Sequence, residues 1–303
     1  MKLALRVKAW RAFGGPAPGK EPAAFWNGGS WAIMASQGLT ALRVATFLFH
    51  DVVDRPEDSG FQRPGALPYK HRPEAFLRYL DAISESPVQP TLVDTITPSA
   101  RGDRILLTFD DGGVSAMRVA GLLEERGWRG HFFITTNRIG TRQFLGRAEI
   151  CDLQRRGHRI GSHSHSHPDI FYDLSTQAMI DEWQASLDIL SEITGETTVM
   201  ASIPGGDLDK RVPLAAEHVG VRYLFTSEPT VRPWRCGKVL CFGRVCPKAT
   251  ARVAAVREFA RFRGFHKAMA VHRIKQAAKW IVYRLRTKAA ARRRPTHPDR
   301  GLP

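Results

Sequence analysis

The chain has 303 residues, of which 43% are hydrophobic, so it can fill the core of one large α/β domain or of two small ones. The net charge is +16, but 17 of the 45 Lys and Arg residues and only two of the 29 acidic residues lie in 244–303. The rest of the chain is nearly neutral, so only this basic segment indicates contact with an acidic surface, either a phosphate backbone or an anionic membrane.

An alternation of apolar strands and amphipathic helices begins near residue 41, after a Gly-, Pro-, Ala- and Trp-rich stretch over 1–38 that we expect to be a poorly ordered extension. Strands are expected at 43–49, 104–109, 131–136, 158–162, 199–203 and 222–227. Helices are expected from Pro73 onward and at 114–126, 147–156, 175–194 and 208–219. The alternation predicts a parallel sheet, open or closed into a barrel, over 39–247.

The third segment, 248–303, carries a long helical pattern over 250–294. Its apolar residues recur at spacings of three and four among Lys and Arg: Val271, Ile274, Ala278, Ile281 and Leu285. One interpretation is an interfacial helix that lies on an anionic membrane. The alternative is a helix that packs on the barrel with a solvated basic face. Nucleic-acid binding is not favoured, because no recognised module accompanies the charge.

Neither a targeting signal nor a disulfide pattern is recognisable in the sequence. No apolar window is long enough for a spanning helix, and charged residues interrupt what would be the apolar region of a signal peptide. We therefore expect a cytoplasmic protein, peripheral on the inner face of the membrane. Four scattered cysteines are too few for a disulfide framework, and free thiols are expected.

Polar clusters follow four of the expected strands. They are His50-Asp51, Asp110-Asp111, the histidines of GSHSHSHPD at 161–169, and Pro204-Gly205-Gly206. Folds built from repeated β-α units place function just past the carboxyl ends of their strands. The four clusters are therefore expected to meet at one face.

Two of these clusters could bind a metal ion. In LLTFDDGG, one of Asp110 and Asp111 could bind the ion while its neighbour stays free as a general base, although Asp-Asp-Gly is also a common turn sequence. Two histidines and one carboxylate leave positions open for water and substrate. In the histidine cluster, a strand would place His163, His165 and His167 on one face, whereas a tight turn would pair only the first and last.

TFDDG, followed some fifty residues later by H-S-x-x-H-P-D, resembles the first two motifs of the polysaccharide deacetylases, the NodB-type carbohydrate esterases of family 4. The resemblance runs over about 40–230 and implies a distorted (β/α) barrel, to which this chain adds a C-terminal basic helical extension. It also implies that Asp110 is the catalytic base and that the metal ligands are Asp111, His163 and His167.

Two other motifs depart from the family pattern. Where members often have R-P-P, with the Arg orienting the catalytic Asp, this chain has SIPGG with Ser202 at the Arg position. Asp110 is therefore expected to lack an ion-pair partner and to have a raised pKa. The Trp-containing motif is not recognisable. The motif that supplies a general-acid histidine is missing downstream, but FLFHD at 47–51 has its form, which resembles the circularly permuted exopolysaccharide deacetylases and makes His50 the candidate acid.

The resemblance implies metal-dependent hydrolysis of N-acetyl groups on an N-acetylhexosamine-containing polysaccharide or lipid-linked glycan, in exopolysaccharide or cell-envelope biosynthesis. Zinc is the first choice of metal, with cobalt, nickel, manganese and iron as alternatives. Substrate contacts are expected from Pro204, Gly205, Gly206 and Asp51. A catalytically inactive barrel that binds glycan or scaffolds a complex is the alternative function, and a basic adaptor that acts through the tail alone is a third.

Overall fold

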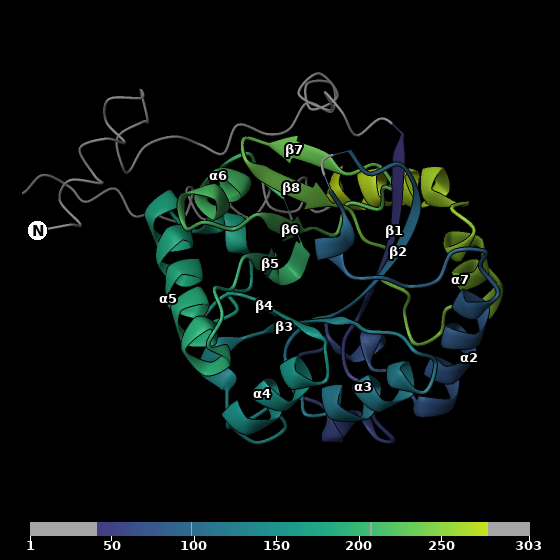
Figure 1. Cartoon of the computed structure of the whole chain (residues 1–303), viewed down its shortest axis with the longest axis horizontal. Coiled ribbons are helices and arrows are strands. Elements are labelled where there is room, and N and C mark those ends of the chain that lie inside the picture. The colour runs from purple at the N-terminus through teal and green to yellow at the C-terminus, as the bar shows by residue number, and fades with distance from the viewer. Residues whose placement is uncertain (1–40, 98, 207, 278–303) are drawn as a thin grey trace, which may run out of the picture.

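A curved eight-stranded sheet lies at the centre of the described chain, and helices surround it (Figure 1). The computed structural model describes residues 41–277, except 98 and 207. The strands are β1 (Leu42–Phe49), β2 (Gly102–Phe109), β3 (His131–Ile134), β4 (Arg159–Ser162), β5 (Met200–Ser202), β6 (Tyr223–Phe225), β7 (Trp234–Cys236) and β8 (Val239–Phe242). Their order in the sheet is β1-β2-β3-β4-β5-β6-β8-β7, and only the β7–β8 pair is antiparallel.

The helices connect these strands and cover the outside of the sheet (Figure 1). They are α2 (Pro73–Ser84), α3 (Ala116–Glu124), α4 (Arg147–Arg155), α5 (Thr176–Thr194), α6 (Arg211–His218) and α7 (Val253–Ala260). The caps expected for α5 are present: Ser175 Oγ accepts a hydrogen bond from the Ala178 N–H, and Gly195 ends the helix in the left-handed conformation. None of the described helices is both long and apolar enough to cross a membrane.

The sheet curls until the segment after β8 meets β1. Just after β8, Val245 exchanges backbone hydrogen bonds with β1: the Leu48 N–H donates to the Val245 carbonyl at 2.8 Å, and the Val245 N–H donates to the Thr46 carbonyl at 2.9 Å. These bonds make β1 a neighbour of both β2 and the segment after β8. The expected distorted (β/α) barrel is confirmed, and the carboxyl ends of its parallel strands meet at one mouth.

The hairpin of β7 and β8 was not expected from the sequence. Each strand has only three or four residues, too few to show an alternating pattern, and the turn between them uses Gly237 at a φ of 59°. Cys236 and Cys241 lie buried in this hairpin, and all four cysteines are free thiols, as expected.

The C-terminal segment enters the core before it leaves the barrel. Val256 and Ala260 of α7 are fully buried in the same hydrophobic cluster as α2, and Phe265 joins them. The Tyr79 hydroxyl of α2 donates to the Ala251 carbonyl at 2.7 Å. The expected boundary at residue 247 is therefore too early, and the packed alternative holds for α7.

A break follows α7, so the single long helix expected over 250–294 is interrupted. Phe262 has a φ of 59°, and helical structure resumes over 265–277. The extension expected at 1–38 and the rest of the tail pattern lie outside the described residues.

Candidate active site and metal centre

The register of β1 against β2 places two expected site residues side by side. Phe49 pairs with Phe109, and the Asp110 N–H donates to the Phe49 carbonyl at 3.0 Å. His50 and Asp110 are the next residues of these paired strands, so both leave the sheet at the same level of the mouth. The expectation that polar residues at strand ends meet is confirmed for this pair.

Asp111, His163 and His167 come together next to them. Their candidate ligand atoms all lie within 4.8 Å of one another, with Asp111 Oδ1 3.6 Å from His163 Nε2 and 3.7 Å from His167 Nε2. Asp111 has a φ of 81°, a left-handed conformation that few non-glycine residues adopt and that the tight Asp-Asp-Gly-Gly turn requires here. The turn thus carries Asp111 back over the mouth, beside its sequence neighbour Asp110.

Tight turns also decide which histidines belong to this cluster. Ser164 and His167 have φ values of 62° and 55°, and the His163 and His167 rings lie 5.0 Å apart. His165 faces elsewhere, with its Nδ1 3.0 Å from Thr136 Oγ1. Glu182 of α5 holds the loop by accepting hydrogen bonds from the backbone N–H groups of His165 and Ser166. The turned backbone, not the extended one, is therefore present.

These three residues fit a divalent metal ion. Burial lowers the pKa of His163 to about 4, so its imidazole is neutral at pH 7, as a metal ligand must be. Burial also raises the pKa of Asp111, because Lys70 and the two histidines compensate only part of the desolvation. Nδ1 of His167 is buried without a hydrogen-bond partner. A desolvated carboxylate beside two imidazoles is a donor set that zinc and other divalent ions accept.

Ser202 orients one of these ligands. Its Oγ lies 2.6 Å from His163 Nδ1, and its carbonyl oxygen lies 3.2 Å from the same nitrogen. Because β4 and β5 pair at Ser162 and Ala201, the next residue along each chain, His163 and Ser202, lies beside the other. A histidine bonded through Nδ1 presents Nε2 to the ion. Ser202, which stands where the family pattern has Arg, therefore orients the metal ligand His163 and not the catalytic Asp110.

The expectation that Asp110 lacks an ion-pair partner is wrong. Arg244, two residues after β8, donates to both oxygens of this carboxylate, at 2.8 Å and 2.9 Å. Its side chain is 0% exposed, and its Nε donates to the Thr226 carbonyl at 2.9 Å. Burial raises the pKa of Asp110, but the charge and hydrogen bonds of Arg244, together with the neighbouring imidazoles, outweigh burial, so the net pKa is lowered. The guanidinium comes from a different strand end than in the family pattern and keeps Asp110 ionised.

His50 lies in the same charged surroundings, near Asp110, Lys70 and Arg244. Burial lowers its pKa to about 4, against the opposing influence of Asp110, so the imidazole is uncharged at pH 7. Its Nδ1 is buried without a hydrogen-bond partner, and its ring lies 5.5 Å from that of Tyr69. The position agrees with the expected general acid, and the role itself stays a prediction.

Asp51 does not face the mouth as a substrate-binding residue would. Its Oδ2 accepts from Lys70 Nζ at 2.8 Å and from the Gly60 N–H at 3.1 Å, and its Oδ1 accepts from Ser115 Oγ at 2.7 Å. The carboxylate is 3% exposed. Asp51 therefore holds other protein groups and is not placed to contact a glycan.

The other expected substrate residues form a short turn after β5. Pro204 and Gly206 are buried, and Gly205 is exposed. Gly206 has a φ of 74°, and a Cβ there would lie 1.8 Å from Ser227 Oγ, so only glycine fits. The turn lies beside the mouth, and its contact with substrate stays a prediction.

Sequence reasoning missed Arg244 and Lys70. Arg244 follows the short strand β8, so the rule for strand ends would have found it had that strand been recognised. Lys70 lies in the Pro- and Gly-rich loop between β1 and α2, where no periodicity marks it.

Comparison with known proteins identifies a family for part of the chain. Residues 98–224 match the sequence model of the polysaccharide deacetylase family. An uncharacterized 30.6 kDa protein in the fumA 3' region of Geobacillus stearothermophilus is 31% identical over 126 residues, which are 41% of this chain and 46% of that protein. The chain thus matches about half the length of its curated relatives.

Solved structures agree in fold. The structure of IcaB from Ammonifex degensii has a TM-score of 0.59 at 18% identity, with 73% of this chain and 99% of that chain covered. The Streptococcus pyogenes deacetylase PplD, in complex with acetate, has a TM-score of 0.56 at 14% identity, with 71% and 96% covered.

The family match contains four expected site residues: Asp110, Asp111, His163 and His167. His50, Lys70 and Arg244 lie outside it, and only the fold brings them to the same mouth. Residues 98–224 thus carry a domain that matches the polysaccharide deacetylase family, and the described chain shares the fold of solved deacetylases.

Proposed function

We propose that this protein hydrolyses N-acetyl groups on an N-acetylhexosamine-containing polysaccharide, with a divalent metal ion held by Asp111, His163 and His167. The observation that carries the proposal is the pairing of this ligand set with a separate, ionised carboxylate on Asp110. One bound ion would supply a Lewis acid that polarises the acetamide carbonyl and acidifies water.

Asp110 has the features of a general base. Arg244 holds both of its oxygens, and its Oδ2 lies 3.9 Å from His163 Nδ1, beside the ligand set but not part of it. The guanidinium lowers its pKa, so the carboxylate is ready to accept a proton at pH 7. A fixed orientation compensates for the weaker basicity, because the acceptor does not have to reorganise during the reaction.

His50 is the proposed general acid. Hydrolysis of an amide needs a proton on the departing amine, since an amide anion is a poor leaving group. The imidazole is neutral in this structure, so it acts as an acid only after it has taken up a proton, and the negative charge of Asp110 favours that uptake. The Nδ1 atom without a partner is one place where this proton can be held.

The proposed setting is exopolysaccharide or cell-envelope glycan biosynthesis. Two facts support acetate release from a polymer: the family match, and the fold shared with PplD, a deacetylase whose structure holds acetate. β1, which His50 directly follows, also lies next to the segment after β8, as a circularly permuted chain requires. Zinc is the proposed metal because histidine and carboxylate ligands suit it.

Metal analysis of the purified protein, combined with acetate release from a panel of N-acetylglucosamine polymers, tests the proposal. Asp110→Asn should keep the metal and lower turnover about a hundred- to ten-thousand-fold. His163→Ala should lose the metal. A fully active Asp110→Asn protein would refute the assignment of Asp110 as the general base. A wild-type protein that binds metal but releases no acetate would favour the inactive glycan-binding barrel.

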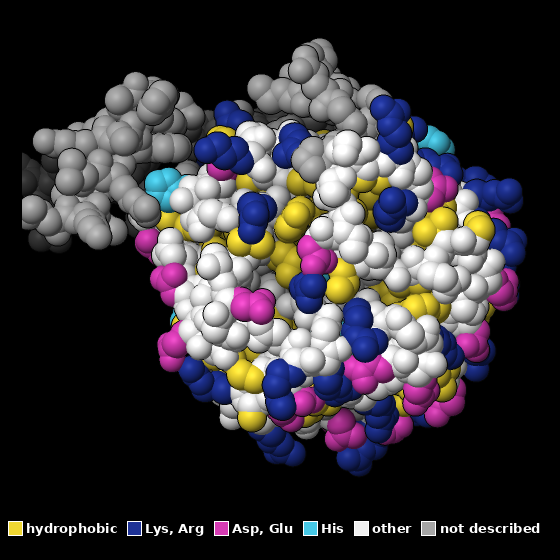
Figure 2. All heavy atoms as spheres, viewed as in Figure 1, with side chains coloured by type: hydrophobic (Ala, Val, Ile, Leu, Met, Phe, Trp, Pro, Cys, Tyr) yellow, Lys and Arg dark blue, Asp and Glu magenta, His cyan; other side chains and the backbone are white. Residues whose placement is uncertain are grey.

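For the C-terminal segment we propose peripheral contact with an anionic membrane, which would place the enzyme on the cytoplasmic face near lipid-linked or nascent glycan. Helical residues 265–277 contain no acidic residue and leave Val271 and Ile274 50% and 70% exposed, among Lys and Arg. By contrast, basic and acidic side chains are interspersed over the face of the described residues that Figure 2 shows. An apolar pair with basic neighbours suits an anionic lipid surface.

Co-sedimentation with phosphatidylglycerol vesicles tests this contact. Val271→Ser/Ile274→Ser should reduce binding, whereas Leu214→Ser, at an exposed apolar position on α6, should not. Any variant that deletes the C-terminal tail should keep residues up to 277, because a deletion from residue 250 onward would remove α7 from the core. Equal binding by the double variant and the wild type would refute the role of this helix.

A further inference from the structure

Lys70 brings a buried ammonium group to the edge of the ligand set. Its Nζ lies 2.8 Å from Asp51 Oδ2 and 3.8 Å from Asp111 Oδ2. The side chains of the three residues are 1%, 3% and 4% exposed. A lysine this buried is tolerated only when its charge is paired, so the contact with two carboxylates is a fixed feature of the fold.

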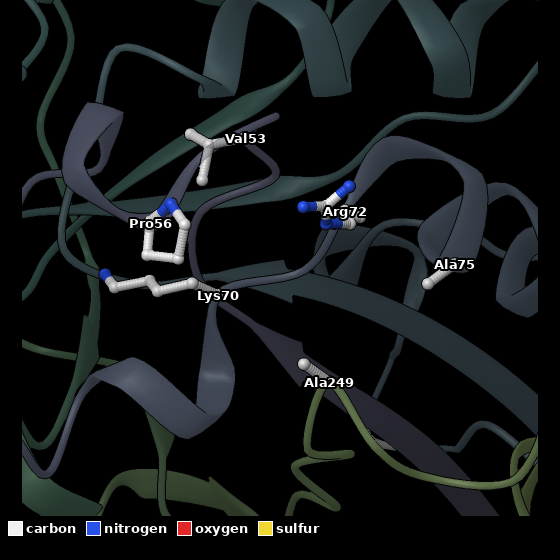
Figure 3. A pocket seen from close by; sticks show the side chains of 6 residues that line it. All are labelled: Val53, Pro56, Lys70, Arg72, Ala75 and Ala249. Atoms are coloured by element: carbon white, nitrogen blue, oxygen red, sulfur yellow. The ribbon is translucent and has the colours of Figure 1, made fainter.

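The path of the side chain explains its burial. Its aliphatic stem borders a pocket of about 280 Å³ that Val53, Pro56 and Ala249 also line. In Figure 3 the stem runs from the main chain past Pro56, and the nitrogen lies at the end remote from Ala75. The apolar part of Lys70 thus belongs to the pocket wall, and only the charged end reaches the carboxylates.

The two oxygens of Asp111 have different surroundings. Oδ1 lies 3.6 Å and 3.7 Å from the Nε2 atoms of His163 and His167, whereas Oδ2 faces Lys70. An ammonium group on one oxygen leaves the other free to bind an ion together with the two imidazoles. Without it, both oxygens could bind the same ion.

Asp51 prevents the ammonium group from swinging away. The Asp51 carboxylate is itself held by Ser115 Oγ and the Gly60 N–H. Gly113 leaves room for it, because a Cβ there would lie 2.0 Å from Asp51 Oδ1. Gly113 is therefore needed for the close approach of Asp51. Through Asp51 and Lys70, a chain of polar contacts runs from Ser115 to Asp111.

We propose that Lys70, anchored by Asp51, is a positioning residue that holds Asp111 with Oδ1 presented to the metal ion. Lys70 also keeps Asp51 out of the ligand set by pairing with its charge. The inference rests on the proposed function in one respect, since it requires that the three ligands bind a divalent ion. Groups that hold a ligand in place typically change metal affinity 10- to 100-fold when removed.

The test compares metal binding by the wild type and by Lys70→Met/Asp51→Asn. The double variant removes one positive and one negative charge, so neither member of the Lys70–Asp51 pair is left buried and charged without the other. Zinc affinity is measured by competition with a chelator, and the visible spectrum of the cobalt-loaded protein reports the coordination number. We expect zinc affinity to fall about 10- to 100-fold and the cobalt spectrum to change.

Controls separate this role from a structural one. Arg126→Met removes a cation that lies in the turn after α3 and pairs with Asp81 of α2, and it should leave both readouts unchanged. If the double variant does not fold, Asp51→Asn alone should weaken zinc binding, because the ammonium group then loses its anchor. Wild-type affinity and spectrum in the folded variants would overturn the inference alone, whereas a wild type that binds no metal would overturn the proposed function as well.

Discussion

The ion pair between Arg244 and Asp110 is the contact whose removal should have the largest effect. Both side chains are almost completely buried, and the guanidinium reaches both carboxylate oxygens. Arg244→Met would leave the carboxylate desolvated without its cation, which typically costs about 3–5 kcal/mol of unfolding free energy. Solvent screening does not reduce this cost, because neither charge faces water. An exposed pair such as Arg147 with Glu192 should cost at most about 1 kcal/mol.

Urea unfolding of the metal-free proteins, followed by circular dichroism, measures these costs. Asp110→Asn alone leaves Arg244 unpaired, whereas the double variant Arg244→Met/Asp110→Asn removes both charges. The cost in the double variant should therefore fall below the sum of the two single costs by about 2–3 kcal/mol. If the two costs simply add, Arg244 does not stabilise the protein through Asp110, and our account of how the base is held is wrong. Arg147→Met serves as the control for the loss of one surface charge.

Three further predictions concern single residues. His165→Ala should keep the metal that His163→Ala loses; loss of metal in both would mean that the extended arrangement of the histidines is the correct one. Gly113→Ala should weaken metal binding and stability, since its Cβ would collide with Asp51; wild-type values in calorimetry and zinc titration would contradict this. Burial lowers the pKa of His131 from 6.5 to about 4, so the unfolded chain takes up this proton first as the pH falls. The stability contributed by neutral His131 is complete above pH 6.5 and declines toward pH 4. Between pH 7 and 5 the wild type should therefore lose about 2 kcal/mol more unfolding free energy than His131→Gln, and equal slopes in urea titrations would argue against this.

Much of the fold could be predicted because its signals are local. The strands before Asp110 and His163 are short apolar runs, and helix α5 has a cap at Ser175 and a stop at Gly195, all within a few residues. The hairpin of β7 and β8 could not be predicted, because strands of three or four residues show too little periodicity. Because β8 was not predicted, Arg244 just after it was not recognised as a strand-end residue either.

The sequence by itself determined the chemistry at two strand ends. Asp110 and Asp111 precede a turn that only glycines permit, and His163 and His167 have the spacing that a tight turn converts into a pair. Only the tertiary structure decided which cation serves the base, since Arg244 is 134 residues away from Asp110. The closure of the sheet makes this contact, because it carries the end of β8 to the mouth beside β1.

The tertiary structure also decided the roles of Lys70 and α7. A buried charge is stable only beside its partner, and the partners of Lys70 come from the ends of β1 and β2. The basic pattern of the C-terminal segment indicated either a membrane or the barrel surface, and the apolar contacts of Val256 and Ala260 with the core decided for α7. Residue type and spacing thus determined which groups can do chemistry. The packing of distant strands determined how those groups are charged and held.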